Sequence, residues 1–171
     1  SGPSTGGTTV TITGTGFVTG ATTSVKFGSL TATGVTVISP TSMTAVSPAT
    51  VNLGTVSVVV TTSGGASQPA GAQGAAADDF TYTAVAPTLT SLTPTSGGSS
   101  GNTLVTITGT GFITGASVTF GGVAGTSLTV VSATQITVRT PATKSLGAVD
   151  VQVTTAGGSS STAGASHNFT Y

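Results

Sequence analysis

The chain has 171 residues, and three Lys or Arg plus three Asp are its only charged side chains, 4% of the total, where a soluble domain typically has about 25%. Binding to nucleic acid needs several clustered cations, and Lys26, Arg139 and Lys144 are scattered singly, so we exclude a nucleic-acid partner. The lack of Cys excludes disulfides and thiol redox chemistry. No apolar run approaches about 18 residues, so we expect no membrane insertion.

Thr, Ser and Gly together make up just over half of the chain. Thr favours strands, and Gly favours turns. Regularly spaced Val, Ile and Phe, with a mean hydropathy of +0.42, argue against disorder. This composition predicts an all-β protein.

The first predicted strand lies in VTITGTGF at residues 10–17, and the same eight residues recur at residues 105–112. The repeat pairs Val10 with Val105 and Ser1 with Ser96, and short insertions in the predicted loops shift the register further on. A repeat of this length predicts two domains, residues 1–83 and 84–171, each able to enclose a modest core. We expect the two glycines of GTGF to form a tight bend that directs Phe17 or Phe112 into the core.

The segment APTLTSLTPT, residues 86–95, precedes the second copy and predicts its first strand, with Leu89 and Leu92 as the apolar positions. The first copy starts at Ser1, directly at the matching turn, so we expect its first strand to be missing from these residues. Either a preceding repeat of a longer polypeptide or a neighbouring subunit would then supply that strand, because an open sandwich edge invites aggregation.

The second copy shows apolar residues with a period of two, separated by Gly, Ser, Pro and Asn, which is typical of half-buried strands and turns. Six or seven short strands in about 80 residues indicate a β-sandwich. The expected inward positions are Val105, Ile107, Val118, Phe120, Leu128, Val130, Ile136, Val138, Val149, Val151, Val153, Phe169 and Tyr171.

The order PTLTSLTPTSGG, VTITGTGF, VTFGG, TPA, GAVDVQVTT, GG and FTY resembles the IPT/TIG family of immunoglobulin-like (Ig-like) domains. The resemblance covers residues 87–171 and, without the first strand, residues 1–82. It implies two tandem Ig-like sandwiches of about seven strands each. Such domains occur in bacterial surface and secreted proteins, in eukaryotic receptors and in transcription factors. Because DNA-contacting relatives use basic loops and receptor relatives commonly contain Cys, the bacterial extracellular type fits best.

Few side chains are suited to catalysis or metal binding. The single His, His167, aligns with Asp78, and no second His or Glu is present to act as a base, so we interpret His167 as structural or solvent-exposed. Asp78 and Asp79 are too few for a calcium site and are interpreted as a solvated turn. Lys26 lies between Val25 and Phe27 on the expected outward face, which argues against an isopeptide crosslink. We therefore predict no catalytic residue, no metal site and no cofactor.

Possible interface residues are Val46 and Val59, where the second copy has Arg139 and Gln152, together with Leu89 and Leu92 of the additional first strand. Two apolar residues in place of polar ones would present apolar surface to a neighbour. Scattered surface valines are also common in proteins that form no such contact. Both interpretations stay open at this point.

The sequence predicts a non-enzymatic structural segment of a secreted or cell-surface protein, acting as a spacer or building block in a stalk, fibre or adhesin. The expected partners are neighbouring Ig-like repeats or identical subunits, with strand complementation as one means of assembly. The alternative is a carbohydrate- or protein-binding accessory module of a secreted enzyme or phage-like particle, with surface glycans or proteins as partners. Exposed aromatic side chains would favour this alternative, and the chain has no Trp and only two Tyr.

Overall fold

The computed structural model describes residues 1–67 and 77–171, which divide into two compact units, Ser1–Thr83 (unit 1) and Ala84–Tyr171 (unit 2). Apart from one short 3-10 helix, every regular element in these described ranges is a β-strand. Each unit contains two sheets. The predicted all-β fold of two tandem Ig-like sandwiches is confirmed.

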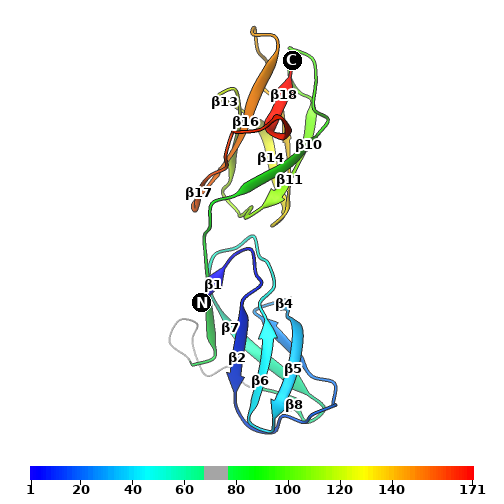
Figure 1. Ribbon diagram of the computed structural model, residues 1–171, viewed down its shortest axis with the longest axis vertical. Coiled ribbons are helices and arrows are strands. Elements are labelled where there is room, and N and C mark those ends of the chain that lie inside the picture. Colours follow the sequence, from blue (N-terminus) through cyan, green and yellow to red (C-terminus); the bar gives the residue numbers. More distant parts are fainter. Residues whose placement is uncertain (68–76) are drawn as a thin grey trace. The chain divides into compact units, whose positions relative to one another are not determined.

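Unit 1 has one sheet in the order β1-β9-β7-β3-β4, with β8 beside β7, and a second sheet in the order β2-β6-β5 (Figure 1). Its strands are β1 (Gly2–Pro3), β2 (Thr9–Thr13), β3 (Ser24–Phe27), β4 (Leu30–Thr31), β5 (Thr33–Ser39), β6 (Ser42–Val46), β7 (Gly54–Thr62), β8 (Gly65–Ala66) and β9 (Asp79–Thr83).

Unit 2 has one sheet in the order β10-β11-β15-β14 and a second in the order β13-β12-β16-β17, with β18 beside β16 (Figure 1). Its elements are β10 (Thr88–Thr93), β11 (Leu104–Thr110), β12 (Ser117–Phe120), β13 (Val123–Ala124), β14 (Thr126–Ser132), β15 (Gln135–Arg139), β16 (Ala148–Thr155), β17 (Gly158–Ser159), the 3-10 helix η1 (Ala165–His167) and β18 (Asn168–Thr170).

The core of each unit lies between its two sheets and contains the inward residues of both. In unit 2 most of the predicted inward residues are fully or almost fully buried, and Leu128, Val130, Val149 and Tyr171 pack against them while partly exposed. Alternate residues of a strand point to opposite faces, so one face of each strand supplies the core. Lys26, on the opposite face of β3, is exposed as predicted.

Three aromatic rings pack edge to face in the same order in both cores. In unit 1 the ring centroids of Phe27 and Phe80 are 5.0 Å apart, and Phe80 is 5.0 Å from Tyr82. The matching rings of unit 2 belong to Phe120, Phe169 and Tyr171, with centroid distances of 5.5 and 5.1 Å. Edge-to-face contacts stabilise aromatic pairs beyond the burial of their area.

The two tyrosines close the sandwiches through their hydroxyl groups. Tyr82 Oη donates to the carbonyl oxygen of Pro48 at 3.0 Å, and Tyr171 Oη donates to that of Pro141 at 3.0 Å. Burial raises the pKa of Tyr82 above its ordinary value. Burial also raises the pKa of Tyr171, against a smaller opposing effect of a hydrogen bond with Thr140. Each tyrosine therefore loses its proton more readily in the unfolded chain than in the folded one.

We expect alkaline pH to destabilise both units. A raised folded-state pKa contributes stability below the unfolded tyrosine pKa of about 10, and this stability is lost as pH rises through the folded pKa. Urea titrations followed by circular dichroism between pH 8 and 12 should show the loss. The double variant Tyr82→Phe/Tyr171→Phe lacks both hydroxyl groups, costing about 1 kcal/mol for each hydrogen bond, but its stability should fall less steeply above pH 10. An equally steep fall in the double variant would mean that the two tyrosines do not cause the loss of stability at high pH.

A strained serine marks the bulge in β14. Ser127 has a φ of 50°, and its counterpart in unit 1 is Gly34, with a φ of 56°. A left-handed backbone costs an ordinary L-residue about 1–2 kcal/mol, whereas Gly adopts it freely. We expect Ser127→Gly to raise the free energy of unfolding of unit 2 by about 1 kcal/mol, measured as a higher urea midpoint. Thr126→Gly, next to it and without a positive φ, should instead lower that free energy.

Candidate functional site

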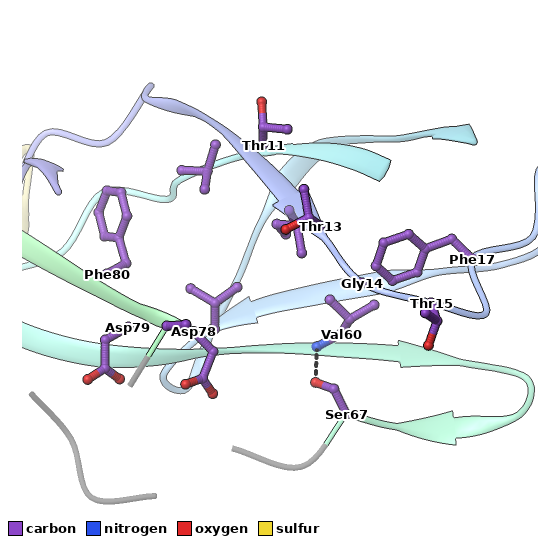
Figure 2. Close-up of a pocket in the computed structure, with 14 residues that line it drawn as sticks. Thr11, Thr13, Gly14, Thr15, Phe17, Val60, Ser67, Asp78, Asp79 and Phe80 are labelled. Carbon is purple, nitrogen blue, oxygen red and sulfur yellow. Dashed lines mark hydrogen bonds between the residues drawn. The ribbon is translucent and has the colours of Figure 1, made fainter. Parts of the chain in front are cut away.

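Unit 1 has an open groove with a volume of about 540 Å³. Figure 2 shows the groove between β2 and the strands β7 and β9. Its apolar lining comes from both sheets of the sandwich, and polar side chains line its rim. The apolar lining residues are Val10, Ile12, Phe17, Val58, Val60 and Phe80, and Ser67, Asp78 and Asp79 are among the polar ones.

In unit 2 the equivalent space is filled by β10, which pairs antiparallel with β11. Leu89 and Leu92 of β10 are only 7% and 5% exposed and belong to the core. Val105 and Ile107 on the adjacent strand are 0% exposed, whereas their counterparts Val10 and Ile12 in unit 1 remain half-buried. Among the residues that the structure describes, none in unit 1 forms a strand at the position that β10 has in unit 2.

Among the described strands, β2 pairs with β6 alone, along one of its two edges. Thr8 donates its N–H to Ser47 Oγ, and Gly14 donates its N–H to the carbonyl of Thr41, so both point towards β6. Successive residues of a strand alternate in direction, and the N–H and C=O groups of Thr9, Thr11 and Thr13 therefore point away from β6. Within residues 1–67 and 77–171, no strand pairs with that edge.

The glycines of the repeated GTGF motif have two different roles, so the prediction that both form a bend is half wrong. Gly16 and Gly111 have φ values of 77° and 72° and make the bend before the phenylalanine. Gly14 and Gly109 have no positive φ, and a Cβ at either would press on the Phe17 or Phe112 ring. A Cβ at Gly109 would also overlap the backbone carbonyl of Thr88 in β10. Gly109 is thus required because another strand crosses it closely.

The rim of the groove differs in chemistry from the matching position of unit 2. There, His167 is 8% exposed, and its Nε2 lies 2.8 Å from the carbonyl oxygen of Leu89, so this nitrogen donates a hydrogen bond to β10. In unit 1 this position is Asp78, and Asp79 Oδ1 accepts a hydrogen bond from Ser57 Oγ at 3.3 Å. Of the two roles considered for His167 from the sequence, structural or solvent-exposed, the structure therefore supports the structural one. Asp78 lies in the turn before β9, as predicted, whereas Asp79 is the first residue of β9, and both side chains are partly buried beside the groove.

The predicted interface residues fall into two groups. Val46 in β6 and Val59 in β7 are half-buried on the outward side, opposite Thr9 and Lys26 in the strand pairing. Leu89 and Leu92 lie inside the core of their own unit. The role of Val46 and Val59 in an interface stays a prediction.

The sequence pattern did not identify the residues that line the groove. Val10 and Ile12 have the pattern of ordinary inward strand residues. The available signal was that a segment with Leu89 and Leu92 precedes the second copy of the motif. Among the described residues, no three His, Cys, Asp or Glu side chains gather in a way that would hold a metal ion. None of the helices found in those residues is long and apolar enough to span a membrane.

One family model matches both halves of the chain. The model of the IPT/TIG domain matches residues 1–82 and 87–171. A comparison with curated protein sequences gave no match. Similar solved structures include the plexin A4 extracellular region, with 20% identity over 99% of this chain and 17% of that chain and a TM-score of 0.47.

Two bacterial structures are also similar. SGBP-B from a xyloglucan utilization locus of Bacteroides uniformis has 22% identity over 92% of this chain and 44% of that chain, with a TM-score of 0.43. InvD of Yersinia pseudotuberculosis has 20% identity over 95% of this chain and 51% of that chain, with a TM-score of 0.38. The chain thus spans about half or less of each of these three structures.

Proposed function

Because the chain belongs to the IPT/TIG family of non-catalytic Ig-like domains, we propose that it is a structural segment of a secreted or cell-surface protein. Its two modules act in series as a spacer or building block of a stalk, fibre or adhesin. The observation that carries this proposal is the repetition of one architectural unit: each module has its own core, and the same Phe-Phe-Tyr cluster packs in both.

The open edge of β2 supports strand addition as the means by which modules of this type associate. An unpaired strand edge above an apolar surface is a template for another strand, and proteins normally cover or blunt such edges. The low charge of the chain removes the repulsion that usually keeps molecules apart. Neighbouring Ig-like repeats or identical subunits are the partners that we expect.

Sedimentation velocity and electron microscopy of the purified chain between pH 5 and 8 test the fibre version of this role. We expect concentration-dependent assembly into oligomers or filaments, strongest near pH 6.5, where the net charge is close to zero. A chain that stays monomeric at millimolar concentration across this range would contradict a fibre-forming role. The variant Val59→Lys adds a charge on the predicted interface face of β7, away from the core, and should weaken assembly while both units stay folded.

A glycan-binding role has less support. Sugar-binding platforms usually present exposed aromatic rings. All six Phe and Tyr82 are buried, and Tyr171 is partly buried with its hydroxyl bound to Pro141. If the full chain bound a glycan array at a level that an unrelated Ig-like domain does not reach, the glycan-binding role would be better supported than the structural one.

A further inference from the structure

We propose that turning of one unit against the other is confined to a single residue, Ala84, because the residue on each side of it is held by one of the units. The joint is stiff for a reason that lies inside unit 2, where two glycines hold the incoming backbone. This inference goes beyond the proposed structural role, and it does not depend on whether the chain assembles or on what it binds.

Unit 1 holds the chain as far as Thr83. Thr83 is the last residue of β9, and it pairs with Pro3 of β1. Its carbonyl oxygen accepts the N–H of Ser4 at 2.9 Å, and its hydroxyl donates to the carbonyl oxygen of Gly2 at 3.2 Å. The backbone of Thr83 is therefore part of a sheet of unit 1.

Unit 2 holds the chain from Val85 onward, two residues after Thr83. Gly157 lies in the turn between β16 and β17, and a Cβ at this glycine would overlap the backbone carbonyl group of Val85. A glycine at such a point allows two stretches of backbone to touch. The Val85 side chain lies against Gly111 of the GTGF bend, where Val85 Cγ2 is 3.5 Å from the position of the missing Cβ. Val85 is thus in contact with two separate turns of unit 2.

The next two residues extend this contact. Pro87 is buried, and its Cα is 3.2 Å from the position of the missing Cβ of Gly111. The Cβ of Ala86 is 3.6 Å from the corresponding position at Gly158. A proline ring fixes its own φ and excludes the helical region for the residue before it, which here is Ala86. The segment from Val85 onward therefore has little freedom before β10 begins.

Ala84 is the one residue between these two anchor points. A residue has only two soft backbone torsions, so few bonds remain about which one unit can turn against the other. Domains in series usually move relative to each other unless a large interface joins them. Here the contact between Val85 and Gly157 limits the motion, and no contact between the surfaces of the units is needed. A spacer with such a joint resists bending.

Nitrogen-15 relaxation of the full chain measures this restriction. It is recorded at a concentration where sedimentation velocity shows a monomer, so that assembly does not slow the tumbling. We expect amide order parameters of about 0.85 at Val85 and Ala86, as in rigid backbone, and a single rotational diffusion tensor that fits both units. Order parameters below about 0.6 at these two amides, or separate tumbling of the two units, would overturn the proposal.

Gly157→Ala tests the contact itself. The new methyl group would overlap the Val85 carbonyl, and β16 and β17 are paired with each other whereas Val85 belongs to no strand. The Val85 backbone should therefore move away from the turn. We expect the order parameters of Val85 and Ala86 to fall below about 0.6 and the two units to tumble separately. Unchanged order at Val85 in a folded variant would contradict the proposed contact.

The matched control is Gly64→Ala, at the equivalent position of the turn between β7 and β8 in unit 1. Neither Gly64 nor Gly157 has a positive φ, so the backbone tolerates Ala at both positions. The nearest atom to a Cβ at Gly64 is Thr62 Oγ1 at 3.6 Å, which is an ordinary contact. This variant should leave the relaxation of both units as it is in the parent chain.

A second variant decides the matter if Gly157→Ala disturbs unit 2 as a whole. Two glycines inserted between Ala84 and Val85 lengthen the joint and leave the contact with Gly157 in place. The order parameter of Val85 should stay high, while the two units tumble separately. Two units that still tumble as one body after this insertion would show that something other than the short joint restricts them, and the proposal would fail. Assembly of the chain bears only on the structural role, so the two ideas can fail independently.

Discussion

Leu92→Ala is expected to lower the free energy of unfolding of unit 2 by about 2–5 kcal/mol. Leu92 is 5% exposed in the core and covers Ile107 of the adjacent strand. Truncation removes buried apolar area and leaves a cavity that the sandwich fills only in part. For a domain of this size each kcal/mol corresponds to about 4–8 °C in Tm. Thermal unfolding with NMR detection of amides in both units would assign the loss to unit 2.

The control for this substitution is Leu146→Ala, which makes the same chemical change at a side chain that is 76% exposed. Surface changes away from special features usually alter stability by about 0.5 kcal/mol or less. Equal losses from the two variants would mean that β10 contributes little to the core of unit 2.

Gly109→Ala should also destabilise unit 2, by about 3 kcal/mol or more. The new methyl group would overlap the Thr88 carbonyl and press on the edge of the Phe112 ring, and the backbone of β10 can move only by giving up its pairing at that end. Urea denaturation and amide exchange in β10 would measure the loss.

Gly14→Ala is the matched change in unit 1. There the new methyl group would meet the end of the Phe17 ring at 2.9 Å, and the three nearest atoms all belong to that ring. A ring edge next to an open groove can shift more easily than a paired strand, so we expect a loss of about 1 kcal/mol. A loss as large as that of Gly109→Ala would show that a strand already lies over the β2 edge.

The regular part of the fold could be predicted from sequence because the pattern of apolar residues is local. Val105 and Ile107, two apart, have to face the same side of a strand, and both are fully buried. The repeat then extended this prediction to Val10 and Ile12. The repeat could not predict that Val10 and Ile12 are only half-buried, because the same residues are fully buried in unit 2.

Contacts between distant segments were beyond sequence reasoning. His167 hydrogen-bonds to Leu89, 78 residues away, and no periodic pattern links them. The close crossing of Thr88 over Gly109 was missed for the same reason, because a glycine in a strand is compatible with a bend as well as with a crossing strand.

The tyrosines that close the sandwiches also give each module a separate optical signal. The chain has no Trp, and its two Tyr are divided between the units, one in each core. In a Tyr82→Phe chain the remaining phenol reports on unit 2, and in a Tyr171→Phe chain it reports on unit 1. Ultraviolet emission can therefore follow the unfolding of either module inside the intact tandem, without an attached dye.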